Sequence, residues 1–247
     1  MARGIVPQLN MADRLVQRAA LGEAERRFLD TLAVREVLVP RGRLIQRAGE
    51  PANDAFLLKS GWAMTFSDFS DGSRQVRRLH FPNDLLAMPS MAMRRHVENI
   101  EALTDCVVAP FAKERIAALF RDHPRLAATF FIFAQVERIT YGDRLCALGR
   151  RSCKARIAFL IMDVVTRLRA IDPSITDRIE MHLTRGQMSE ITGMTPVHAS
   201  RMWNKLKAEG IIAAENGEVS ILDERRLVAL SGFVDRSLDM DFSWLPS

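Results

Sequence analysis

The 247-residue sequence has only three cysteines, Cys106, Cys146 and Cys153, and no CxxC pair. This excludes a disulfide framework and fits a reducing cytosol. The longest apolar stretch, residues 126–134 interrupted by Thr129, is far shorter than the roughly 20 residues of a membrane helix. The first residues contain no apolar run typical of a signal peptide. We therefore expect a cytoplasmic protein with no membrane partner.

The short motifs of common enzyme classes are also missing. There is no GxSxG, HExxH, P-loop or GxGxxG sequence. The five histidines are scattered and are not set beside carboxylates at metal-ligand spacing. A lone histidine, such as His80, His96 or His123, is more often structural than a ligand. We therefore expect no catalytic residue, no metal site and no cofactor, and predict that the protein is not an enzyme.

What is present is the composition of a globular protein, 48% hydrophobic and 26% charged, with length enough for two domains. The net charge of +5 is modest but unevenly distributed. Between residues 144 and 169, seven basic residues are opposed only by Asp163. Such a run is either a solvated helix face or a surface that binds a polyanion, so a second, independent signal is needed.

The pattern changes twice along the chain. Residues 10–33 have helical spacing with an interruption at residues 21–23. Residues 34–111 contain short β-prone runs separated by turn residues, and Asp71-Gly72 is a strong hairpin signal. Repeated strands without helices between them favour an antiparallel roll or barrel. From residue 113 onward the pattern is helical.

A long helix is predicted from Pro124 to about residue 148, because proline is favoured at a first helical turn. Its apolar residues exceed one stripe, which indicates one face against the roll and another against a second copy of the chain. The alternative is an ordinary core helix. The predicted dimer seam follows spacings of three and four residues: Thr129, Ile132, Val136, Ile139, Asp143 and Cys146.

Cys146 on this seam is a candidate redox residue that oxidation would modify or link across a dimer. The alternative is a small buried hydrophobe. Gly149 then interrupts the helical pattern, so we place the domain boundary near residues 149–152. The predicted organisation is an N-terminal helix and roll over residues 1–120, a dimerisation helix over 121–149, and a third region over 150–247.

The segment from residue 182 to 222 carries the most information. Thr184 and Gln187 form a predicted capping box that starts one helix. Gly193 allows a sharp turn, and Thr195 with Pro196 starts a second helix. Two short helices joined by a turn that contains glycine are the signature of a helix-turn-helix.

The second helix separates into two faces at 100° per residue. Its predicted inner face consists of Ala199, Met202, Trp203 and Leu206. Its predicted outer face offers the donors and acceptors that a recognition helix needs in a major groove: Val197, Ser200, Arg201, Asn204 and Lys205. Asn216-Gly217 then marks a hairpin that would form a wing. Glu215 and Glu218 would repel phosphate, so we expect this wing to contribute little.

With these pieces in order, the chain resembles the Crp/Fnr family of bacterial transcription regulators over about residues 25–230. Matching residues in the first half are Gly49-Glu50, Phe56-Leu57, Gly61, Asp71-Gly72, Pro82 and Asp84. More specific matches in the second half are Leu183-Thr184-Arg185, Gly193, Thr195, Ser200-Arg201, Leu206 and Gly210. The resemblance implies an α+β fold: an N-terminal antiparallel β-roll of the cupin-like jelly-roll type, a long dimerisation helix and a C-terminal winged helix-turn-helix. It also implies a homodimer on palindromic double-stranded DNA, with RNA polymerase as a further partner.

The resemblance also implies roles for individual residues. Thr184 and Arg185 should contact phosphates, while Val197, Ser200 and Arg201 face base edges. Many relatives carry glutamate at the place of Val197, and Pro196-Val197-His198 is similar to regulators of the alphaproteobacterial nitrogen-fixation and denitrification branch. The complete predicted DNA-binding set is Thr184, Arg185, Gln187, Thr195, Val197, His198, Ser200, Arg201, Asn204 and Lys205.

The sensor half departs from the family pattern. Cyclic-nucleotide binders carry a Gly-Glu pair where this chain has Ala87-Met88, and an Arg-Ser or Arg-Thr pair where it has residues 96–99. Glu98 would oppose a cyclic phosphate, although Arg94 and Arg95 just upstream could substitute if the loop is displaced. Cyclic AMP is therefore disfavoured as the signal.

Other known signals of the family are disfavoured too. Because no cysteine precedes position 106, the iron–sulfur cluster of the oxygen-sensing branch is excluded. The haem-ligating positions hold Ala87, Met88 and Pro89. The effector is therefore unidentified. The readings left open are a regulator without a signal, an effector- or redox-gated regulator, and a winged-helix module that binds protein.

Overall fold

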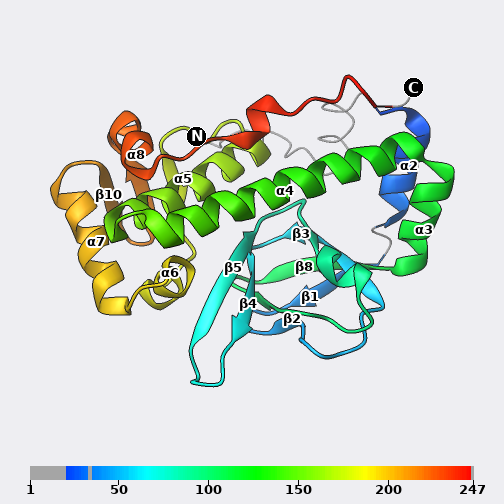
Figure 1. The fold of residues 1–247 in the computed structure, drawn as a ribbon, viewed down its shortest axis with the longest axis horizontal. Helices are drawn as coiled ribbons and strands as arrows, with labels where there is room; N and C mark the ends of the chain where they lie inside the picture. The colour runs from blue at the N-terminus through cyan, green and yellow to red at the C-terminus, as the bar shows by residue number, and fades with distance from the viewer. Residues whose placement is uncertain (1–20, 33–34, 246–247) are drawn as a thin grey trace, which may run out of the picture. The chain divides into compact units, whose positions relative to one another are not determined.

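The computed structural model of the protein describes residues 21–32 and 35–245. Two compact units are formed (Figure 1). The roll unit comprises the described residues up to Gly142 together with those from Arg236 onward, and the C-terminal unit runs from Asp143 to Asp235. No helix in the described ranges is long and apolar enough to cross a membrane.

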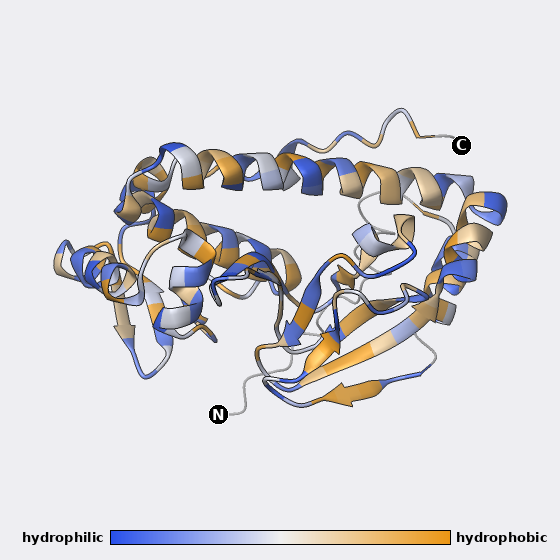
Figure 2. Ribbon diagram, turned by 60° about the horizontal axis from the view of Figure 1, so that its bottom comes forward, coloured by the Kyte–Doolittle hydropathy of each residue, from blue (hydrophilic) through white to orange (hydrophobic). Residues whose placement is uncertain are grey.

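The roll unit contains two four-stranded antiparallel sheets, ordered β1-β8-β3-β6 and β2-β7-β4-β5. Figure 2 shows that hydrophobic residues dominate several of these strands. Buried side chains such as Leu58, Phe66 and Leu79 fill the space inside the roll. The strands are β1 (Val37–Val39), β2 (Leu44–Gln46), β3 (Asp54–Ser60), β4 (Ala63–Asp68), β5 (Arg74–His80), β6 (Leu85–Leu86), β7 (Asn99–Ala102) and β8 (Cys106–Ala112).

The antiparallel roll predicted from the sequence is confirmed, and so is its hairpin. Strands β4 and β5 pair antiparallel across Asp71-Gly72, where Gly72 takes a positive φ of 81° and Phe69 N donates to Ser73 O at 2.9 Å. The sequence did not indicate β6 or β7. Strand β6 has only two residues, and β7 reads Asn-Ile-Glu-Ala, with few β-prone residues.

In the described part of the roll unit, three helices and the C-terminal tail accompany the sheets: α2 (Glu23–Leu32), α3 (Lys113–Asp122) and the first part of α4 (Pro124–Arg150). The short 3-10 helices are η1 (Met88–Ala92) and, in the tail, η2 (Arg236–Asp239). Leu29, Leu119, Leu126 and Leu245 are buried in one cluster. The N-terminal helix predicted over residues 10–33 is present from Glu23 to Leu32, and residues 10–20 and 33 lie outside the described ranges.

The two units divide differently from the predicted regions. Helix α4 is continuous over 27 residues, so the break predicted near residues 149–152 matches the junction between α4 and α5. The compact units nevertheless divide at Gly142 and Asp143, inside that helix. The predicted third region includes the tail, whereas residues 236–245 pack with the roll unit, because Leu245 enters its core cluster.

The C-terminal unit is a winged helix-turn-helix. Strands β10, β11 and β9 form a three-stranded sheet in that order. Helix α5 lies at the centre, with most of its residues from Ala155 to Val165 buried. The elements are α5 (Cys153–Ile171), β9 (Arg178–Glu180), α6 (Arg185–Thr192), α7 (Pro196–Ala208), β10 (Ile212–Glu215), β11 (Glu218–Ile221) and α8 (Glu224–Ser231).

Candidate nucleic-acid interface

The start of α6 is fixed by the predicted capping box. Thr184 Oγ1 accepts a hydrogen bond from Gln187 N at 3.1 Å, and Thr184 N donates to Gln187 Oε1 at 2.9 Å. These bonds satisfy two backbone N–H groups that a helix N-terminus otherwise leaves unpaired. At the other end Gly193 takes a left-handed conformation with φ of 62°, which lets the chain turn into α7.

Helix α7 presents a polar face to solvent. Thr195 Oγ1 accepts a hydrogen bond from His198 N at 3.3 Å, and Pro196 occupies the first helical position, as predicted. Ala199, Trp203 and Leu206 are buried, while Met202 is half-buried. The predicted division of the helix into two faces is therefore confirmed. Exposed on the other side are Val197, His198, Arg201, Asn204 and Lys205, and Ser200 is half-buried among them.

Arg185 lies between α6 and α7. Its guanidinium carbon is 3.9 Å from the centroid of the Trp203 ring, and its Nη1 lies 3.1 Å from Met188 Sδ. Burial lowers the pKa of Arg185, because part of the guanidinium has lost its water. From the sequence we placed Trp203 only in the core. The contact with Arg185 joins two different helices, and the periodicity of a single helix does not indicate it.

The wing has the predicted turn. Asn216 and Gly217 both take positive φ values, 50° and 86°, and β10 pairs antiparallel with β11. Positive φ at both central residues is the geometry of a tight two-residue hairpin. Glu218 pairs with Arg178 of β9 at 3.2 Å, so its charge is partly compensated within the wing.

The basic run over residues 144–169 is largely paired with its own chain. Lys154 Nζ lies 2.8 Å from Glu209 Oε2, and Arg169 Nη1 lies 2.7 Å from Glu224 Oε1. Arg156 Nη1 donates to Thr192 O at 3.3 Å, and Arg151 Nη2 donates to Gly232 O at 2.9 Å. The sequence leaves open whether this run is a solvated helix face or a surface that binds a polyanion. The paired cations join elements of the C-terminal unit, which does not favour the polyanion-binding surface.

The structure corrects part of the predicted dimer seam. Thr129 and Ile132 are buried inside the chain, with exposed fractions of 0% and 7%, and cannot contact a partner. Val136 packs against the same core cluster, and Asp143 is half-buried. Only Ile139 and Cys146 of the predicted seam are exposed. The helix buries these positions because α4 covers the core of its own roll unit.

An exposed stripe instead follows the same spacing one residue earlier on α4. One residue turns a helix by 100°, which is enough to exchange a buried face for an exposed one. Phe131 and Leu145 on this stripe are 55% and 72% exposed. The stripe consists of the exposed residues Phe131, Arg138, Gly142 and Leu145, with Gln135 half-buried between them.

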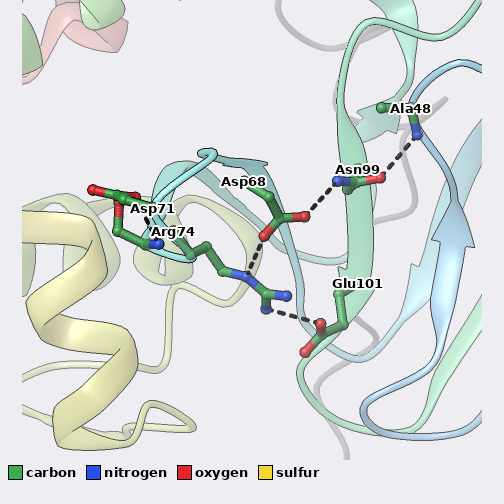
Figure 3. A network of polar contacts seen from close by, with 7 residues as sticks. Ala48, Asp68, Asp71, Arg74, Asn99 and Glu101 are labelled. Carbon is green, nitrogen blue, oxygen red and sulfur yellow. Dashed lines mark hydrogen bonds and ion pairs between the residues drawn. The ribbon is translucent and has the colours of Figure 1, made fainter.

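In the roll unit, the residues that replace the family's phosphate cassette have partners within the chain. Figure 3 shows Asn99 of β7 between two neighbours: its Nδ2 donates to Asp68 Oδ2 at 3.1 Å, and its Oδ1 accepts from Ala48 N at 2.8 Å. In the same network Arg74 joins Asp68 to Glu101, at 3.2 and 3.1 Å. These side chains tie three strands and a turn together.

Glu98, beside Asn99, is buried and forms an ion pair with Arg77 of β5. Burial raises the pKa of Glu98, the nearby Arg77 acts in the opposite direction, and Glu137 of α4 raises it further. Glu137 itself forms an ion pair with Arg78 of β5. Glu98, just before β7, and Glu137 of α4 therefore pair with arginines of β5 at the place where the resemblance puts an anionic ligand.

The cysteines and histidines occupy separate places. Cys106 is buried, its Sγ donates to Trp62 O at 3.1 Å, and burial raises its pKa to about 11, so it is not a reactive thiol. Cys146 is exposed, which does not fit the alternative of a hydrophobe buried within the chain. His80 Nε2 is 2.7 Å from Thr65 Oγ1, and His123 packs on Phe28. Among the described residues, no three His, Cys, Asp or Glu side chains form a group that could hold a metal ion.

The chain contains a β-roll, a long helix and a winged helix-turn-helix in this order, and its two domains each match a known family. Residues 36–123 match the cyclic nucleotide-binding domain family, and residues 155–230 match the Crp-like helix-turn-helix domain family. The FixK2 structure from Bradyrhizobium japonicum has a similar fold, with a TM-score of 0.73 at 20% identity, covering 81% of this chain and 98% of that chain.

Curated relatives with similar sequences are also regulatory proteins. The transcriptional activator protein anr of Pseudomonas aeruginosa is 26% identical over 83% of both chains. The nitrogen fixation regulation protein FixK of Bradyrhizobium diazoefficiens is 26% identical over 86% of this chain and 88% of its own. The chain belongs to the Crp/Fnr family of DNA-binding transcription regulators.

Proposed function

We propose that this protein binds a palindromic site in double-stranded DNA as a homodimer and regulates transcription in the cytoplasm. The observation that carries the proposal is the exposed polar face of α7, set beside the capped start of α6. Arg201 and Ser200 would read base edges, Val197 would contact a thymine methyl, and Lys205 and Arg185 would contact phosphates. The remaining residues of the predicted DNA-binding set would support these contacts: Thr184, Gln187, Thr195, His198 and Asn204.

The homodimer is supported by the exposed apolar residues of α4. Phe131, Ile139 and Leu145 are each about half exposed or more, at 55%, 48% and 72%. Large apolar side chains repeated along one face of a helix are typical of a helix–helix interface. We propose that the stripe from Phe131 to Leu145, with Ile139 and Cys146 at its edge, contacts the same stripe of a second copy.

We further propose that the sensor is degenerate toward cyclic nucleotides. Glu98 lies in the stretch, residues 96–99, where the resemblance places the anion-binding Arg-Ser or Arg-Thr pair, and it is paired with Arg77. Arg78 is paired with Glu137 and so links β5 to α4. A bound anion would have to displace carboxylates from both arginines. Two other signals stay compatible with this arrangement, an effector other than cyclic AMP and oxidation at the exposed Cys146.

A selection from random duplexes tests the proposal. The full-length protein is mixed with a pool of random double-stranded DNA, and bound duplexes are recovered in gel shifts at several salt concentrations. Enrichment of a sequence with twofold symmetry, bound more weakly as salt rises, is the expected result. Selected DNA without twofold symmetry would contradict the dimer on a palindrome.

The same assay addresses the alternative of a protein-binding winged helix. That alternative predicts no retention of duplex DNA at any salt concentration. Addition of cyclic AMP should leave the affinity for the selected site unchanged, because Glu98 opposes the phosphate. An increase of tenfold or more would contradict the degenerate sensor. Retention of RNA polymerase on the selected site would identify the further partner.

A further inference from the structure

The contact between Arg185 and Trp203 has the geometry of a cation–π interaction. Arg185 Cζ lies only 3.9 Å from the centroid of the indole. At this separation the guanidinium lies over the face of the ring, because an approach in the ring plane would keep the two further apart. The face of tryptophan carries the strongest attraction for a cation among the aromatic side chains. The ring therefore holds the guanidinium at a fixed place beside the start of α6.

Trp203 has a polar N–H group that a position in the hydrophobic core does not need. The side chain is 1% exposed, and its Nε1 has no hydrogen-bond partner among the described residues. A buried N–H without a partner is unfavourable, and a leucine or phenylalanine would fill a core position without it. What tryptophan adds at this position is the face that covers the guanidinium of Arg185.

The charge of Arg185 is not neutralised by the protein. Among the described residues its one hydrogen bond joins Nη1 to Met188 Sδ at 3.1 Å, and no carboxylate pairs with it. Lys154 and Arg169, by contrast, are bound to Glu209 and Glu224. Arg185 also stands at the first position of α6, where the helix dipole disfavours a cation. The stability of α6 therefore does not explain why position 185 carries an arginine.

A guanidinium stacked on a ring keeps its N–H groups in the plane of the group. Its face is covered by the ring and its Nη1 is bonded to Met188 Sδ, so Nε–H and Nη2–H are the groups left for paired hydrogen bonds to two oxygens of one phosphate. Holding the side chain in advance also reduces the conformational freedom that binding would otherwise remove. A lysine also binds to an aromatic face, but it has no planar edge that such a contact could orient for paired hydrogen bonds.

We propose that Trp203 is a positioning residue that holds the Arg185 guanidinium edge-on for a phosphate diester of the DNA backbone. This inference rests on the proposed function, because it assigns a role to one residue of the same interface. It also gives a reason why a core position of α7 carries tryptophan.

The salt dependence of DNA binding tests the proposal with full-length protein and the selected duplex. The slope of log K against log salt concentration counts the phosphates that the protein neutralises. Arg185→Ala should reduce the size of this slope by about one. Trp203→Leu should reduce it by a similar amount although the arginine is still present. Trp203→Phe, which keeps an aromatic face, should stay near the wild-type slope.

The double variant and a matched control separate positioning from stability. Arg185→Ala with Trp203→Leu should show the slope of Arg185→Ala alone, because both changes remove one contact. Leu206→Val alters another fully buried residue of α7 and should leave the slope unchanged. Trp203→Leu with the wild-type slope, or reductions that add in the double variant, would overturn the proposal.

A measurement that needs no change at Trp203 covers the case in which Trp203→Leu does not fold. Trp62→Phe and Trp244→Phe leave Trp203 as the single tryptophan of the chain. In that background Arg185→Ala should increase quenching of Trp203 fluorescence by acrylamide, because one face of the ring loses its cover. Unchanged quenching would overturn the inference. If the wild-type protein retains no duplex at all, the proposed function fails, and the fluorescence result still decides whether the stack exists.

Discussion

Lys154 at the start of α5 and Glu209 at the end of α7 form a bidentate ion pair, with Nζ 2.9 Å from Oε1 and 2.8 Å from Oε2. The two residues are 55 positions apart. The pair holds the helix proposed to read DNA against the central helix of its unit. The carboxylate also cancels a charge that, in the sequence, belongs to the most basic segment of the chain.

This pairing predicts that Lys154 does not contribute a phosphate contact. Lys154→Ala should leave the salt dependence of DNA binding unchanged, and it should lower the free energy of unfolding by about 0.2–1 kcal/mol, as for partly exposed ion pairs. Lys205→Ala, at an exposed position of α7, should reduce the slope by about one. Binding titrations at four or more salt concentrations measure both. Equal loss of slope in the two variants would show that the Lys154 pair opens on DNA.

Arg201 should carry sequence readout. Arg201→Ala should weaken binding to the selected site by about 1–3 kcal/mol and relax the preference at one base position, because a guanidinium can contact both acceptors of a guanine edge. Arg225→Ala changes an exposed arginine of α8 and serves as the control. Gel shifts with the selected duplex and with scrambled duplex give the comparison. If Arg201→Ala weakens both duplexes equally, Arg201 contacts the backbone only.

Glu98 should make the stability of the roll unit fall as pH rises. Burial raises the pKa of Glu98, so the folded state binds this proton more tightly than the unfolded chain does. By linkage, stability is then lost as pH increases from the ordinary glutamate range toward the raised pKa. Glu98→Gln removes this titration. Its Tm relative to wild type should therefore rise as pH increases above the ordinary glutamate range. A difference in Tm that stays constant over this range would refute the assignment.

Cys146 should be the residue that links two copies under oxidation. Its side chain is exposed on α4, whereas Cys106 is buried with a pKa of about 11. After treatment with peroxide, non-reducing electrophoresis should show a dimer band in wild type and in Cys153→Ser, but not in Cys146→Ser. A crosslink that survives Cys146→Ser, or no crosslink in wild type, would remove the redox hypothesis.

The C-terminal tail should stabilise the roll unit through Leu245. This side chain is 7% exposed within the core cluster, and Phe242 packs on Phe133 with ring centroids 6.0 Å apart. Leu245→Ala should cost about 1.5–3 kcal/mol, the value of a buried leucine side chain. Trp244→Ala is the matched control, because Trp244 is 57% exposed and should change stability little. Thermal unfolding followed by circular dichroism distinguishes the two variants.

The sequence by itself determined the features that depend on neighbours along the chain. The capping box of Thr184 and Gln187, the start of α7 at Pro196, and the hairpins at Asp71-Gly72 and Asn216-Gly217 are all present as predicted. Each is fixed by backbone hydrogen bonds or φ angles within about four residues, so the local residue types suffice. The two faces of α7 follow from the helical period in the same way.

Only the tertiary structure decided which groups from distant segments meet. It paired Lys154 and Arg169 of the basic run with Glu209 and Glu224. The exposed stripe of α4 lies one residue away from the predicted seam, and the tail packs with the roll unit. The tertiary structure also placed Arg185 over Trp203. The physical reason is that ion pairs, burial and stacking depend on positions in space. A periodic pattern shows that a helix has an apolar face, but not which neighbour covers it.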